Sequence, residues 1–193
     1  MSFDKSRLKR LALIALALQS TGRIVGRTKV QKLLYLANLC GWNAANFSYH
    51  NYGPYSETLA EELDNMRKVG WVDEVHLETS KDRILYSYAL SRKARQRALS
   101  LVGKMQDFGA EKLVKKTGGL VRFLNKFESD ELEIMATLVF LKRENPSRST
   151  DDVMKLAQEL KPQFGWDQIS KGRRIFRIMR DYLPAEELSR LKD

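Results

Sequence analysis

Three carboxylates on one predicted helix are the first residues whose spacing could support chemistry. Glu57, Glu61 and Asp64 stand at positions i, i+4 and i+7, so a helix places them on one face. Such a face could hold a divalent cation, although metal-binding carboxylates usually come from several elements of a fold. The pattern favours a solvated face, or a surface for a basic partner. We therefore expect no metal site.

Motifs for catalysis or cofactor binding are scarce in the rest of the chain. His50 could act as an acid or a base, but a hydrogen-bonded loop histidine is the more common role. Two histidines and one cysteine cannot build a usual zinc site. Residues 26–29 lack the glycine spacing of a phosphate-binding loop. The sequence therefore predicts a protein that binds rather than catalyses, with no cofactor.

Positive charge is the strongest compositional signal, with a formal net charge of +10 over 193 residues. Residues 1–54 contain eight Lys or Arg and one acid, and residues 80–126 contain twelve and three, but residues 55–79 contain two and seven. Two basic blocks thus flank one acidic helix. This asymmetry indicates a polyanionic partner, with nucleic acid as the first choice. A solvated basic surface is the alternative.

Hydrophobic periodicity predicts a mainly α chain. The predicted order is three helices over residues 6–19, 28–39 and 55–70, two strands over 71–78 and 84–90, a long helix from 91, and C-terminal helices over 130–142, 150–160 and 166–182. Three helices followed by a hairpin wing and another helix is the order of a winged helix. We expect a winged-helix-like domain over 1–95, a connecting helix over 96–127, and a helical C-terminal domain over 128–193 with a possible second helix-turn-helix.

Two short motifs in the first 95 residues carry a resemblance to known proteins. Gln31-Lys32-Leu33 lies in the second helix, and Tyr52-Gly53-Pro54 precedes the third. These elements resemble a YwgA-like family and, more distantly, the Panacea antitoxin domain. The resemblance implies a winged-helix-like domain, in a group that includes toxin-neutralising proteins and regulators. It implies no catalytic residue.

The leading hypothesis is a DNA-binding transcriptional regulator whose contacts with duplex DNA are salt-sensitive. The side chains expected to contact phosphate lie near the start of the second helix, at the tip of the wing and on the last long helix. They are Arg27, Lys29, Lys32, Lys81, Arg83, Lys171, Arg174 and Arg177. A further basic run, residues 92–97, follows the wing.

The third helix is an unusual recognition helix. It is acidic, which repels phosphate, and residues 41–54 separate it from the second helix, whereas a simple helix-turn-helix has a short turn. Base reading would therefore be confined to its start, at Tyr55, Ser56 and Thr58.

A protein-binding module is the second hypothesis. An antitoxin-like or adaptor protein would present the acidic third helix and the aromatic loop 42–54 to a toxin or client protein. It predicts an exposed apolar patch with Trp42, Phe47 or Tyr55. DNA binding instead predicts a continuous positive face that joins Arg27, Lys29 and Lys32 to the wing.

The amphipathic helix from residue 91 favours a homodimer, with Ala98, Leu101 and Met105 in the interface.

The single cysteine, Cys40, excludes an intramolecular disulfide and fits a buried position. Residues 11–18 are apolar but short, so they fit a core helix better than a signal peptide. We expect a cytoplasmic protein without a membrane segment.

Overall fold

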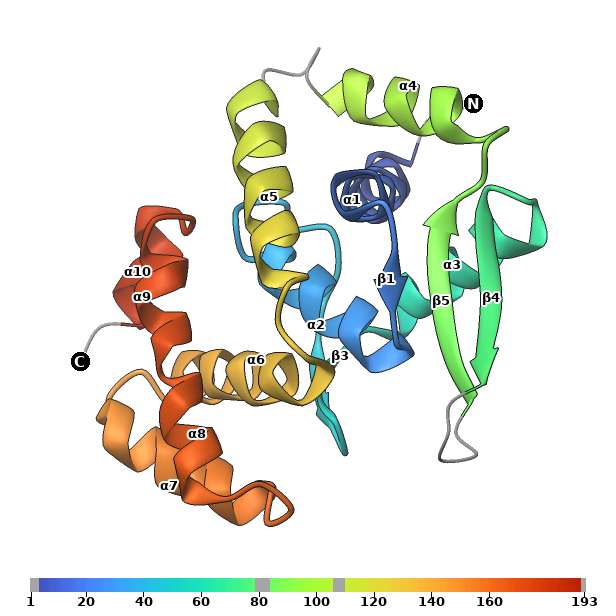
Figure 1. Cartoon of the computed structure of the whole chain (residues 1–193). Helices are drawn as coiled ribbons and strands as arrows, with labels where there is room; N and C mark the ends of the chain where they lie inside the picture. The colour runs from blue at the N-terminus through green and yellow to red at the C-terminus, as the bar shows by residue number, and fades with distance from the viewer. Residues whose placement is uncertain (1–3, 79–83, 106–109, 192–193) are drawn as a thin grey trace.

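A mainly α fold is present in the computed structural model, which describes residues 4–78, 84–105 and 110–191 (Figure 1). In the first half, the elements are α1 (Lys5–Thr21), β1 (Ile24–Val25), α2 (Arg27–Asn38), β2 (Ser48–His50), β3 (Gly53–Tyr55), α3 (Glu57–Lys68), β4 (Val72–Glu78) and β5 (Ile84–Leu90). The predicted helices and strands of this region are confirmed. The strands β1, β2 and β3 were not predicted, since two or three residues are too few to show an alternating pattern.

The central element is α1. All residues of its segment 12–18 are buried, which is typical of a helix surrounded by other elements. Its neighbours are α2, α3, α4, α5 and strand β5. The three-stranded antiparallel sheet has the order β1-β5-β4, and β2 and β3 form a separate hairpin between α2 and α3.

The predicted connecting helix is two helices, α4 (Arg95–Met105) and α5 (Glu111–Leu124), which run in different directions (Figure 1). Gly118 and Gly119 lie inside α5. A Cβ at Gly118 would lie 2.9 Å from Ser20 Oγ, so this glycine permits the close approach of α5 and α1. Ala98 and Met105 are buried, and α4 packs on α1 of the same chain. Two of the three residues predicted for a dimer interface are therefore already covered.

The remaining helices are α6 (Ser129–Glu144), α7 (Thr150–Leu160), α8 (Trp166–Gly172), α9 (Arg174–Arg180) and α10 (Ala185–Arg190). The predicted helix over 166–182 is thus divided into α8 and α9. The buried helix α6 packs against α7 and α8 on one side and against α2 and β3 on the other. One hydrophobic cluster extends from Leu8 to Leu191, so the core is continuous across the predicted boundaries at 95 and 128.

No helix among the described residues is long and apolar enough to span a bilayer.

Candidate functional site

The two motifs that carry the resemblance contact each other directly. Gln31 Nε2 donates to the Ser56 carbonyl at 3.2 Å, and the Ser56 N–H donates back to Gln31 Oε1 at 3.0 Å. Lys32 Nζ donates to the Pro54 carbonyl at 2.8 Å. Both side chains are buried. The α2 residues therefore hold the β2–β3 hairpin and the start of α3 in place through backbone atoms.

A second lysine supports the same hairpin from the C-terminal half. Lys161, in the break between α7 and α8, donates from Nζ to the Asn51 carbonyl, and lies 2.7 Å from Glu133 Oε1 of α6. The side chains of Lys161 and Glu133 are only 1% and 6% exposed. This buried ion pair fixes the tip of the hairpin against α6.

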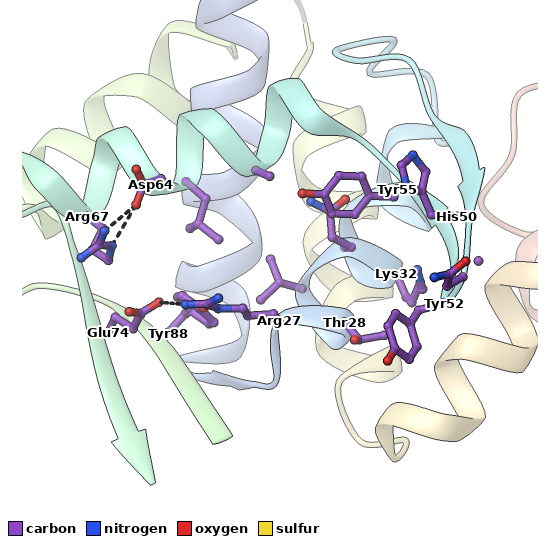
Figure 2. A pocket seen from close by; sticks show the side chains of 16 residues that line it. Arg27, Thr28, Lys32, His50, Tyr52, Tyr55, Asp64, Arg67, Glu74 and Tyr88 are labelled. Atoms are coloured by element: carbon purple, nitrogen blue, oxygen red, sulfur yellow. Dashed lines mark hydrogen bonds and ion pairs between the residues drawn. The ribbon is translucent and has the colours of Figure 1, made fainter. Parts of the chain in front are cut away.

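The supported hairpin forms one wall of a cleft of about 570 Å³. The other walls are the N-terminal part of α2, one face of α3, and strands β4 and β5 (Figure 2). Val30, Ala60 and Leu63 contribute apolar atoms to its lining. The volume is in the range of pockets that take small molecules or single peptide side chains.

One end of the cleft is charged. Arg27 Nε donates to the Tyr88 hydroxyl at 3.0 Å, and the guanidinium lies 3.8 Å from the centre of the Tyr86 ring and 3.7 Å from Glu74 Oε2. The hydrogen bond to Tyr88 raises the pKa of Arg27, and burial raises the pKa of Tyr88 to about 12. Arg27 therefore stays charged and is held in one orientation.

On α3, Asp64 accepts from Lys68 at 2.6 Å and from Arg67, and these hydrogen bonds lower the pKa of its carboxyl. Asp64 is therefore paired with two cations of its own helix, α3. Among the described residues, no group of three His, Cys, Asp or Glu could hold a metal ion.

The other end of the cleft is aromatic. The rings of His50 and Tyr55 lie 5.0 Å apart, and Tyr52 is 63% exposed (Figure 2). An exposed tyrosine at this level is unusual for a residue with a purely structural role, because the ring gives up burial of a large apolar area. The exposure of Tyr52 could not be read from the Tyr52-Gly53-Pro54 motif.

Two residues predicted to contact DNA are removed from the open surface, Lys32 fully and Lys29 in part. Lys32 is 1% exposed. Lys29 Nζ donates to the carbonyls of Asn125 and Phe127 at 2.9 and 2.7 Å, and burial lowers its pKa. Among the described residues, Lys29 and Lys32 therefore do not extend a positive face from Arg27, because both bind backbone carbonyls.

The residues predicted to read bases at the start of α3 differ in exposure. Ser56 is buried, whereas Thr58 is exposed and its hydroxyl lies 3.1 Å from that of Ser56. Tyr55 lines the cleft. Lys81 and Arg83, predicted at the wing tip, lie outside the described residues.

The C-terminal basic residues lie in a different place. Lys171, Arg174 and Arg177 line a shallow hollow on α8 and α9, with two further arginines. Lys171 pairs with Asp167 at 2.6 Å, and Arg174 pairs with Glu131. The structure therefore does not bring them together with Arg27.

Of the residues predicted for an exposed apolar patch, only Tyr55 lines the cleft. Trp42 is buried and donates to Thr117 Oγ1 at 2.9 Å, and Phe47 packs on Tyr35. Burial raises the pKa of the Cys40 thiol to about 12, so the thiolate form is scarce at neutral pH.

The chain resembles YwgA. Over 85 residues, 44% of the chain, it is 32% identical to YwgA of Bacillus subtilis (strain 168), whose description is an uncharacterized protein. The chain spans about half of that protein's length, 51%. No family model matches the chain. The similarity supports the predicted resemblance to YwgA-like proteins.

The buried lysine of the α2 motif should make stability depend on pH. Burial lowers the pKa of Lys32 from 10.5 to about 8. Between these values the unfolded chain binds more protons than the folded chain, so the free energy of unfolding should rise with pH. From about pH 7 to about pH 10 we expect Lys32 to contribute a gain of about 2 kcal/mol, which Lys32→Met lacks. Urea titrations of both proteins measure it, and equal rises would contradict it.

Proposed function

We propose that the chain is a protein-binding module of the antitoxin-like or adaptor kind, which takes a peptide segment of its partner into the cleft. Its first 90 residues would be a winged-helix module. The order α1-β1-α2-α3-β4-β5 and the sheet order β1-β5-β4 support this assignment. The β2–β3 hairpin is then an insertion between the second and third helices that adds a wall to the cleft.

The observation that carries the proposal is that the side chains of Gln31 and Lys32 hold the β2–β3 hairpin. Their polar groups bind the backbone of residues 54 and 56, so they support the hairpin instead of facing solvent. The hairpin in turn presents the exposed ring of Tyr52 beside an apolar floor. Aromatic side chains at the rim of a preformed cleft are typical of sites that bind protein partners.

Charge also favours a protein over DNA at this face. The side of α3 that faces solvent exposes Glu57 and Glu61, and these carboxylates repel phosphate. A peptide carries both signs of charge, so it can pair with Arg27 and avoid this repulsion. The apolar floor between the ends of the cleft fits one bulky apolar side chain of the peptide.

Selection of displayed random peptides on the purified protein tests the proposal. We expect enriched peptides with an aromatic or large aliphatic residue. Tyr52→Ser should raise the Kd of such a peptide about tenfold or more, since loss of an aromatic anchor typically costs more than 1 kcal/mol. Ala60→Arg, which places a long side chain in the cleft, should abolish binding. Fluorescence anisotropy of a labelled peptide measures both.

The matched control is Glu61→Gln, which changes the neighbouring α3 residue outside the cleft and should leave the Kd within about twofold. The proposal is wrong if no peptide is enriched, or if the enriched peptides bind Ala60→Arg as tightly as the original protein.

A further inference from the structure

A second exposed surface lies around the start of α4, beyond the end of the β4–β5 ladder. We call it the α4 cation surface, and it consists of Arg92, Lys93, Arg95 and Arg97, all of which are exposed. These residues follow Leu90, which pairs with Val72 at one end of the β4–β5 ladder. Ile84, the first residue of β5, lies at the opposite end of the ladder, about 20 Å away along the seven-residue strand.

The position of α4 changes the interpretation of this basic run. In the sequence this run directly follows the wing. Figure 1 shows α4 at the far end of the two strands, beside the start of α1. The α4 cation surface therefore lies at the opposite end of β5 from Ile84, and none of its residues lines the cleft.

Acidic partners are absent from this surface. No Asp or Glu occurs between residues 84 and 105. Within the described ranges, none of the four cations forms an ion pair, whereas Lys171, Arg173 and Arg174 pair with Asp167, Asp151 and Glu131. The positive potential of the α4 cation surface is thus not neutralised by the chain itself, and an external anion is its natural partner.

The backbone under these cations is fixed. Ser91 Oγ donates to the Gly70 carbonyl at 2.7 Å and accepts from the Ala94 N–H at 3.2 Å. The guanidinium of Arg97 lies 6.0 Å from the centre of the Trp71 ring. Because the turn is held before any ligand arrives, less ordering entropy opposes binding.

The composition of the surface identifies the kind of anion. The apolar face of α4, with Ala98, Val102 and Met105, is buried in the protein and cannot insert into a membrane. Residues 91–105 contain no aromatic side chain on which bases of a single strand could stack. Four exposed cations close together in the sequence, with no acidic residue among residues 84–105, suit the regularly spaced phosphates of a duplex.

We propose that the α4 cation surface binds the phosphate backbone of duplex DNA, without reading base sequence. The partner bound by the cleft and the DNA would then occupy different faces of the same chain. Binding through four phosphates gives a slope of log affinity against log salt of about −3 to −4, and each lost cation should reduce it by about one.

A titration of a labelled mixed-sequence duplex across a salt series tests this inference. Replacing all four cations with glutamine should weaken binding at low salt at least tenfold and flatten the slope to near zero. The matched control makes the same change of charge at four exposed cations of α8 and α9, Lys171, Arg173, Arg177 and Arg180. It should retain affinity within about threefold, because only the general charge is altered.

Three outcomes would overturn the inference. They are no duplex binding at low salt, equal losses in the two variants, and tighter binding to a single strand than to the duplex. Ala60→Arg in the cleft should leave DNA binding unchanged, and the α4 variant should still bind the selected peptides. Failure of one proposal is therefore distinguishable from failure of the other.

Discussion

Lys161→Ala should lower the free energy of unfolding by about 3 to 5 kcal/mol, the usual cost of leaving one member of a buried ion pair without its partner. Glu133 is 6% exposed on its side chain, so its carboxylate cannot recover hydration when the ammonium is removed. The Asn51 carbonyl loses its donor as well. Urea denaturation followed by circular dichroism measures the change.

An exposed pair of the same chemistry provides the control. Lys171→Ala breaks the pair with Asp167, in which both side chains are more than two thirds exposed, and should cost less than about 1 kcal/mol. Lys161→Met combined with Glu133→Leu removes both buried charges and should recover most of the loss. Equal effects of Lys161→Ala and Lys171→Ala would show that the buried pair is not important for stability.

Gly53→Ala should destabilise the chain by about 2 to 4 kcal/mol, because two separate costs coincide at this residue. Its φ of +84° lies in the left-handed region that side chains disfavour. A Cβ would also lie 2.7 Å from Thr137 Oγ1 of α6, which is too close for either atom. Thermal unfolding measures the loss.

Gly70→Ala separates the two costs. Gly70 has a similar φ of +71°, but nothing lies within 4 Å of the position of its Cβ. Its replacement should therefore show the backbone cost alone, about 1 kcal/mol. Thr137→Ala in the Gly53→Ala background should recover part of the difference. If Gly53→Ala and Gly70→Ala have the same effect, the hairpin does not depend on close contact with α6.

The sequence predicted the long helices and the β4–β5 hairpin because their apolar residues repeat over two or more turns or alternate over seven residues. The same method missed the β2–β3 hairpin. Its three-residue strands show no period, and the groups that hold it are three backbone carbonyls and one N–H. Backbone atoms are the same in every residue type, so no sequence pattern marks them as partners.

The prediction that Lys32 contacts DNA equated a lysine with a surface charge, and the burial of Lys32 does not fit it. Lys32 lies in a run of ten residues, 31–40, that are all buried. That run is apolar on every side of the helix, which was a signal that its polar residues are internal as well. Lys161, beside a proline in a break between helices, gave no such signal. Its burial depends on Glu133 and Asn51, which are distant in sequence.

The support of the hairpin through main-chain atoms has a consequence for how binding preference could change. Residues 50–52 are exposed, and the bonds from Lys161, Lys32 and Gln31 end on main-chain atoms of residues 51, 54 and 56. New side chains at residues 50, 51 and 52 would alter one wall of the cleft and keep the hydrogen bonds that hold the hairpin in place. Substitutions at the hairpin tip can therefore change what the cleft binds with little loss of folding stability. Relatives could differ at these positions, and a designed library could vary them.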